Sequence, residues 1–128
     1  MKTRFVLQRA DGDCGIAALA MALGLPYEDV YTAVVRVEPQ RRGRAGLHAC
    51  QIVATARKLN AAFRIRRKWS LDKHDGVLGI VKISEPRKTG HWVALLDGLV
   101  LDPDGEIATY DDYFQGSAWK PTILLTDD

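Results

Sequence analysis

Residues 91–102 read HWVALLDGLVLD, which is two apolar runs joined by Asp97-Gly98. Asp-Gly between two such runs is a strong short-range signal for a β-hairpin with a two-residue turn. With that turn, Leu96 pairs with Leu99, and this pair sets the register of every pair further from the turn. The stretch therefore predicts an antiparallel hairpin.

The same register places His91 and Asp102 on one face of the hairpin as diagonal neighbours, because side chains on a strand repeat every two residues. Their backbones should then lie roughly 7–8 Å apart, a gap that two side chains can close with a hydrogen bond. A carboxylate in this position fixes the imidazole tautomer and stabilises the imidazolium. We therefore expect a catalytic histidine with an orienting Asp102. The alternative is a half-exposed histidine beside a turn formed by residues 102–105, Asp-Pro-Asp-Gly.

Outward from the hairpin, the second half of the chain reads as strands. In residues 63–66 apolar and basic side chains alternate, so we expect Phe63 and Ile65 to share one face of a half-exposed strand. Residues 77–83 form an apolar run of strand length, and a last strand is expected around 122–125. His74 stands in a polar turn, where we expect it to be solvated.

The first half reads as three helices, at about 14–23, 26–38 and 47–59. Asp11 or Asp13 can cap the first of them. Helices followed by strands indicate an α+β domain, with N-terminal helices packed against a C-terminal antiparallel sheet. The length of 128 residues suits one domain over residues 1–128.

Cys14 stands at the expected start of the first helix, where unpaired backbone N–H groups and the helix dipole stabilise a thiolate. A thiolate is a better nucleophile than an ordinary thiol at neutral pH. The small residues Gly15, Ala17 and Ala18 follow and allow close approach to it. Gln8 lies upstream, and its amide can donate to a developing oxyanion together with the backbone N–H of Cys14. A buried structural cysteine is the alternative interpretation.

Charge and composition restrict the other functions. The formal net charge is +2, but residues 1–68 hold 13 Lys and Arg against 5 Asp and Glu, whereas residues 69–128 hold 5 against 11. We interpret this asymmetry as attraction between two halves of one domain. A basic surface that contacts nucleic acid is the weaker alternative. Zinc-binding motifs and a glycine-rich phosphate loop are absent from the sequence, so we expect neither a metal nor a cofactor.

The sequence also bears on location. No apolar stretch approaches the roughly 20 residues of a membrane span, and the first residues carry no signal-peptide pattern. We therefore expect a cytoplasmic protein in which Cys14 and Cys50 are both free thiols.

Together the two motifs resemble the double-glycine, or bacteriocin-processing, peptidases, a branch of the papain-like superfamily. The resemblance is carried by residues 8–23, QRADGDCGIAALAMAL, and residues 90–105, GHWVALLDGLVLDPDG. The first stretch has the family's Gln, Asp-Cys-Gly and small-residue helix. The second has its His-aromatic-Val strand, followed by a strand that ends in Asp-Pro. Gly46-Leu47 stands where the family has the head of a further helix.

The resemblance implies a papain-like fold, with Cys14 as nucleophile on the central helix and His91 as general base and acid on the sheet. It also implies Asp102 as the orienting residue and Gln8 as the oxyanion donor. The implied function is a cysteine peptidase or related amide hydrolase that acts on a peptide or protein through an acyl-enzyme. The alternative is a catalytically silent module that keeps the fold and recognises a peptide or protein partner.

Overall fold

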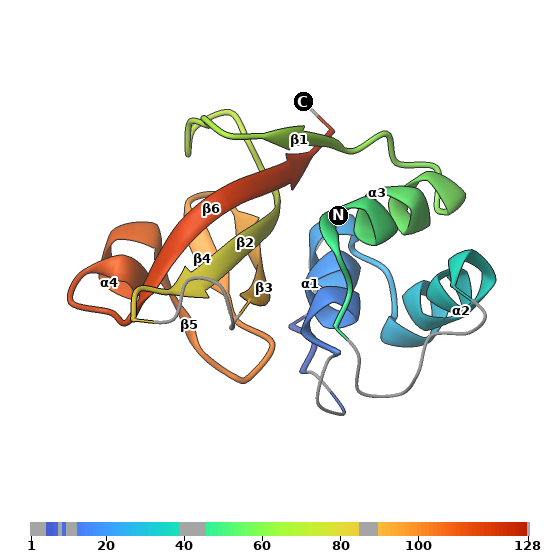
Figure 1. Cartoon of the computed structure of the whole chain (residues 1–128), viewed down its shortest axis with the longest axis horizontal. Coiled ribbons are helices and arrows are strands. Elements are labelled where there is room, and N and C mark those ends of the chain that lie inside the picture. The colour runs from blue at the N-terminus through green and yellow to red at the C-terminus, as the bar shows by residue number, and fades with distance from the viewer. Residues whose placement is uncertain (1–4, 8, 10–12, 39–45, 85–89, 128) are drawn as a thin grey trace.

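The computed structural model describes residues 5–7, 9, 13–38, 46–84 and 90–127, and these form three helices, then a sheet with one further helix (Figure 1). In chain order the elements are α1 (Cys14–Leu23), α2 (Tyr27–Val37), α3 (Ala49–Lys58), β1 (Arg64–Arg66), β2 (Gly76–Lys82), β3 (Gly90–Leu96), β4 (Leu99–Leu101), β5 (Ile107–Thr109), α4 (Tyr110–Phe114) and β6 (Trp119–Thr126). No helix in these ranges is long and apolar enough to cross a membrane.

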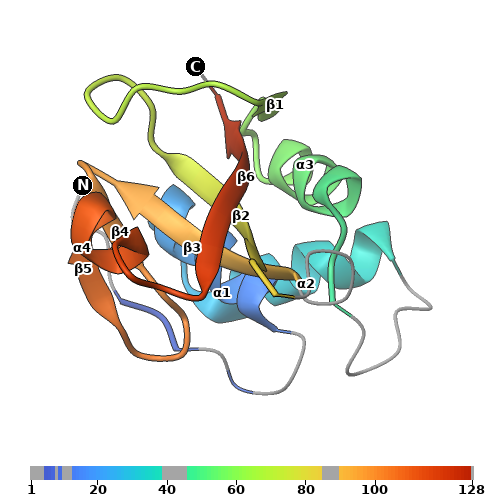
Figure 2. The same cartoon turned by 60° about the vertical axis from the view of Figure 1, so that its left-hand side comes forward.

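The six strands form one sheet in the order β1-β6-β2-β3-β4-β5, and every neighbouring pair is antiparallel. Helices α1, α2 and α3 lie on one side of this sheet and α4 on the other (Figures 1 and 2). The prediction of an α+β fold, with N-terminal helices against an antiparallel sheet, is confirmed.

Both faces of the central strands are buried, which explains why β2 reads as a continuous apolar run. On the side of the first three helices, Val77 and Leu125 pack with Ile16 and Leu19 of α1. On the opposite side, Leu78 of β2 belongs to a second cluster of buried side chains that also contains Tyr113 of α4. The sheet therefore holds α1 and α4 in fixed positions on either side of β3.

The predicted hairpin is confirmed in type and register. Leu96 pairs with Leu99, and the pairs continue outward from there along β3 and β4. Asp97 and Gly98 have φ angles of 51° and 77°, as a type I′ turn requires at both central positions. The twist of this turn matches that of the strands, so the hairpin register needs no bulge.

The helices differ from the sequence prediction mainly at their starts. Pro26 is the N-cap residue of α2 rather than its first helical residue. The third helix begins at Ala49 and not at position 47, because His48 is its N-cap and the backbone N–H of His48 donates to Gln51 Oε1 at 2.8 Å. The helix ends at Lys58, one residue before the expected end at 59, and Asn60 just beyond has the left-handed φ of 67° that commonly follows a helix.

Phe63 and Ile65 line one pocket, as expected of residues on one face, although Ile65 on the edge strand β1 is 49% exposed and Phe63 only 7%. Two other expectations for the second half were wrong. His74 is not simply solvated, since its Nδ1 accepts a hydrogen bond from the backbone N–H of Ser70 at 2.9 Å. The last strand is longer than expected, and it accommodates Pro121 beside a shift of register between Gly79 and Ile80.

Candidate active site

His91 and Asp102 meet where β3 begins and β4 ends. His91 is the second residue of β3, and Asp102 directly follows β4. His91 Nε2 lies 2.7 Å from Asp102 Oδ1, and the two side chains are 15% and 3% exposed. The structure thus brings together the two residues that the hairpin register placed on one face.

The carboxylate of Asp102 is enclosed by donors. The hydroxyl of Tyr113 donates to Oδ2 at 2.5 Å, and the backbone N–H of Asp104 donates to Oδ1 at 3.1 Å. Burial alone would raise the pKa of Asp102, but the hydrogen bonds from His91, Tyr113 and Asp104 outweigh it and hold the pKa below its ordinary value. The N–H of Gly105 also donates to the Asp102 carbonyl, so residues 102–105 form a turn as well. The turn and the histidine contact are therefore compatible.

His91 favours its charged form. Burial opposes the charge, but hydrogen bonds to Asp102 and Cys14 outweigh this effect and raise the pKa of His91 to about 10. Because Nε2 is bonded to Asp102, Nδ1 is the ring nitrogen left for Cys14. His91 therefore links the helix that carries Cys14 to the strand end that carries Asp102.

Cys14 is the first residue of α1 and is 9% exposed. Asp13 is the N-cap residue, but its side chain makes no capping hydrogen bond. Its carboxylate accepts instead from the hydroxyl of Tyr27 at the start of α2. The expectation that Asp13 caps the helix is therefore wrong for its side chain, and Asp11 lies outside the described residues. The N–H groups of the first turn of α1 have no intrahelical acceptor. They lie at the N-terminal end of the helix, which is the end that carries Cys14.

The packing behind Cys14 explains the small residue that follows it. A Cβ atom added to Gly15 would lie 3.3 Å from side-chain atoms of Leu47, Ile52 and Trp92. Trp92 Nε1 in turn donates to the carbonyl of Leu47 at 2.8 Å, which ties β3 to the segment before α3. A glycine at position 15 lets Trp92 pack against the start of α1, and Trp92 is the neighbour of His91.

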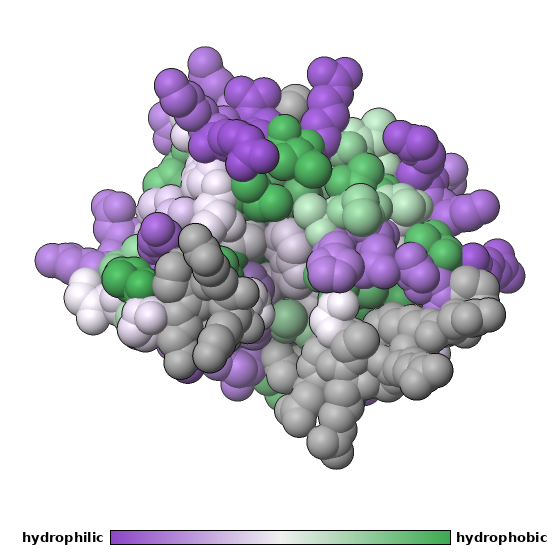
Figure 3. Space-filling model, viewed as in Figure 1, coloured by the Kyte–Doolittle hydropathy of each residue, from purple (hydrophilic) through white to green (hydrophobic). Residues whose placement is uncertain are grey.

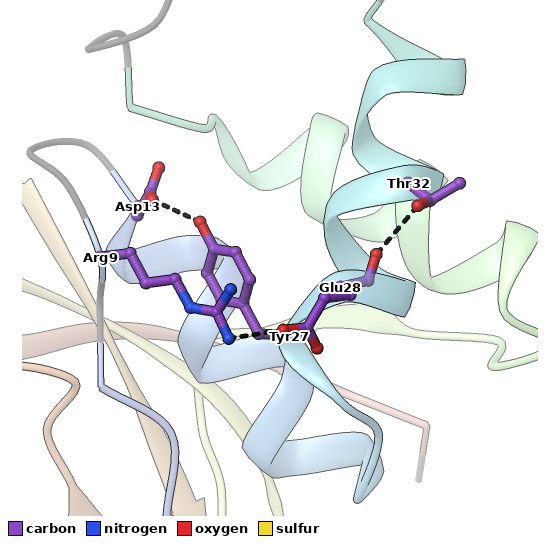
Figure 4. Close-up of polar contacts among 5 residues, drawn as sticks. All are labelled: Arg9, Asp13, Tyr27, Glu28 and Thr32. Carbon is purple, nitrogen blue, oxygen red and sulfur yellow. Dashed lines mark hydrogen bonds and ion pairs between the residues drawn. The ribbon is translucent and has the colours of Figure 1, made fainter.

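A cluster of polar side chains between α1 and α2 includes Asp13, the residue that precedes Cys14 (Figure 4). The guanidinium carbon of Arg9 lies 4.2 Å from the centre of the Tyr27 ring, and Arg9 Nη2 lies 2.6 Å from Glu28 Oε1. This hydrogen bond from Arg9 holds the pKa of Glu28 below its ordinary value. Tyr27, the first residue of α2, thus contacts both Arg9 and Asp13. These contacts link the start of α2 to the residue that precedes Cys14.

One aromatic ring stands beside the histidine. The Trp119 ring centre lies 5.6 Å from that of His91 at an interplanar angle of 34°. Lys82 of the neighbouring strand β2 places its Nζ 5.7 Å from the centre of the Trp119 ring. Trp119 therefore packs beside the imidazole of His91.

Of the four predicted site residues, the structure brings Cys14, His91 and Asp102 together, whereas Gln8 lies outside the described residues. The sequence analysis missed Tyr113, which contacts Asp102, and the Tyr27 contact with Asp13. The sequence does contain a start signal for the helix that carries Tyr113, namely Thr109 followed three residues later by Asp112. In the structure the Thr109 side chain caps this helix by accepting the backbone N–H of Asp112.

Other features of the described residues bear on cofactors. No group of three His, Cys, Asp or Glu side chains in these ranges is arranged to hold a metal ion. Cys14 and Cys50 are free thiols.

A scan against protein-family models and a search of curated proteins both found no match to this chain.

Proposed function

We propose that the protein is a papain-like cysteine peptidase or related amide hydrolase in which Cys14 is the nucleophile. The observation that carries the proposal is that one imidazole, His91, contacts a thiol at a helix N-terminus and a buried carboxylate. Acyl transfer by a cysteine needs at least a nucleophile, a base and an orienting group, with the base hydrogen-bonded to the other two. The packing of α1 against β3 supports the papain-like arrangement, because nucleophile and base come from the helical and sheet parts.

In the proposed mechanism the Cys14 thiolate attacks the substrate carbonyl carbon, and the carbonyl oxygen takes the negative charge. The unpaired N–H of Cys14, together with the side-chain amide of Gln8, stabilises this oxyanion. When the C–N bond breaks, His91 gives the proton on Nδ1 to the leaving amine, and an acyl-enzyme forms on Sγ.

Deacylation returns the site to its starting state. Neutral His91 takes a proton from the incoming water, and the resulting hydroxide attacks the thioester carbon. The C–S bond breaks, the carboxylic acid leaves, and Cys14 again faces a protonated His91. Asp102 stays ionised throughout and keeps Nε2 of the imidazole as its hydrogen-bond donor. An amine in place of water would give transfer rather than hydrolysis by the same steps.

The test is turnover of a quenched-fluorescence peptide library by the wild-type chain and by Cys14→Ala. We expect Cys14→Ala to lower kcat/KM by about 10³-fold or more, because no other nucleophile occupies its place. Cys50→Ala is the matched control, since this free cysteine is exposed on α3, and its turnover should equal that of wild type. Full activity in Cys14→Ala would contradict the proposal. If the wild-type protein binds peptides of the library but cleaves none of them, the protein is the catalytically silent binding module instead.

A further inference from the structure

The outer strand β1 has one open side. It pairs with β6 through Arg64, Ile65 and Arg66, and among the described residues no strand lies on its other side. An edge strand presents unpaired backbone N–H and C=O groups, which another extended chain can pair with. Figure 1 shows β1 at the top of the molecule, and in the sheet β6 and β2 lie between it and β3, the strand that carries His91. The open side of β1 is therefore separate from the candidate active site.

A pocket of about 410 Å³ lies beside this strand, between α3 and β1. Its wall is mostly apolar, and Figure 3 shows apolar surface among hydrophilic side chains over these two elements. Seven residues line it: Cys50, Val53, Ala54, Arg57, Phe63, Arg64 and Ile65. The exposure of Ile65, at 49%, is explained by its position on this wall. The pocket is large enough for an apolar side chain that enters from outside.

The rim of the pocket is basic. Arg57 and Arg64 line it, both are exposed, and neither forms an ion pair with a described acidic side chain. Among the residues that the structure describes, no acidic side chain lines the pocket, and the chain continues from β1 into the basic residues Arg67 and Lys68. A partner that covers this surface gains most if it carries negative charge, because unlike potentials favour association and orient it.

Two other occupants fit less well. If β1 of a second copy paired antiparallel with β1, Arg64 of one copy would face Arg66 of the other, and like charges directly opposite are destabilising. Single-stranded nucleic acid binds such basic surfaces through exposed aromatic platforms, but Phe63, the aromatic residue on this wall, is only 7% exposed. The apolar pocket and the free strand edge both favour a peptide.

We propose that β1 and this pocket, together the β1 edge site, bind an extended acidic segment of a partner protein by strand addition. The partner's backbone pairs with β1, one apolar side chain enters the pocket, and its carboxylates lie against Arg57 and Arg64. This mode combines backbone hydrogen bonds for affinity with a side-chain pocket for specificity. The inference does not depend on the proposed catalytic function.

The test uses a short fluorescein-labelled peptide of alternating glutamate and leucine, with fluorescence anisotropy as the readout and Cys14→Ala as the protein to prevent cleavage. We expect saturable binding that weakens as salt is raised, and no binding of the lysine-leucine counterpart. The double variant Arg57→Glu/Arg64→Glu should weaken binding by about tenfold or more. Arg36→Glu reverses the charge of an exposed residue on α2, away from the pocket, and as a control for surface charge reversal it should bind as wild type.

A second variant separates the pocket from the charge. Ala54→Trp fills the pocket without changing the net charge, and it should also weaken peptide binding. Circular dichroism reports whether each variant is folded. Lack of saturable binding at 1 mM peptide (on the order of the weakest specific affinities) would overturn the proposal. Equal loss in Arg36→Glu, or tighter binding of oligouridylate than of the peptide, would overturn it too. Self-association of the protein that the double variant abolishes would assign the surface to a second copy instead.

Discussion

Among the individual side chains, Asp102 has the most constrained environment at the candidate site. Its carboxylate is 3% exposed and accepts from His91, from Tyr113 and from the N–H of Asp104. Charge-assisted hydrogen bonds of this kind are about twice as strong as neutral ones, and together they offset the cost of burying the charge. Asp102 can therefore stay ionised beside His91 and hold one face of the imidazole fixed.

Tyr113 acts on the site through Asp102, so we regard it as a positioning residue. In Tyr113→Phe one donor to the carboxylate is lost, and the pKa of Asp102 should rise, because that hydrogen bond lowers it. The acidic limb of the kcat/KM profile should therefore move to higher pH, and kcat should fall by about tenfold while KM changes little.

The matched control for Tyr113→Phe is Tyr31→Phe, because Tyr31 is 45% exposed on α2. It should leave both the pH profile and kcat as in wild type. A structural role alone would predict that Tyr113→Phe lowers only the free energy of unfolding, by about 1–3 kcal/mol. A wild-type pH profile in Tyr113→Phe would contradict the positioning role.

His91 itself should titrate far above an ordinary histidine. Its pKa of about 10 means that the ring stays charged through neutral pH, and NMR of the imidazole resonances should show this directly. In Cys14→Ala the pKa should fall, because the contact that raises it is removed while that of Asp102 remains. The charged ring contributes stability that is fully present below about 6.5, the ordinary value, and lost as the pH rises through 10. Titration near 6.5 in the wild-type chain would contradict the proposed contacts.

For the strands and helices, the turn at Asp97 and Gly98 has the greatest effect on the site. It sets the pairing of β3 with β4, and through that pairing it decides that His91 and Asp102 lie on one face. Both turn residues have positive φ, a conformation that side chains with a branched Cβ adopt only under strain.

Gly98→Val should therefore lower the free energy of unfolding by about 1–3 kcal/mol, measured by urea denaturation. A Cβ at this position would meet no other atom within 4 Å, so the expected cost is conformational and not steric. Gly90→Val is the matched control, because Gly90 also has open space and lacks the positive φ. Equal stability of the two variants would mean that the turn conformation is not the constraint proposed here.

The same elements show what a sequence can predict and what it cannot. The helix from Cys14 to Leu23 and the hairpin were predictable, because each has a local signal in its apolar pattern or its turn residues. The strand β5 and the helix α4 are only 3 and 5 residues long, too short for a periodic pattern to appear. The exposure of Ile65 depends on the position of β1 at the edge of the sheet, which no local pattern encodes.

For the protein as a whole, the candidate site lies where the helical first half meets the sheet of the second half. Sequence analysis could pair His91 with Asp102, because both belong to one hairpin. It could name Cys14 from its helix start and from a family resemblance, but its approach to His91 depends on the packing of α1 against β3. Tyr113 reaches Asp102 from the opposite side of the sheet, and only the tertiary structure reveals that contact. The role of Gln8 stays a prediction.

The central claim is that Cys14 and His91 form a reactive pair, and the most direct test is the rate of Cys14 alkylation by iodoacetamide against pH. The measurement is made in Cys50→Ala, because the second thiol is exposed and would react as well. We predict rapid alkylation already at about pH 6, with a loss of tenfold or more when His91→Ala is added. If Cys14 instead reacts only near the ordinary thiol range of about 8.5, and His91→Ala changes nothing, the reactive pair does not exist.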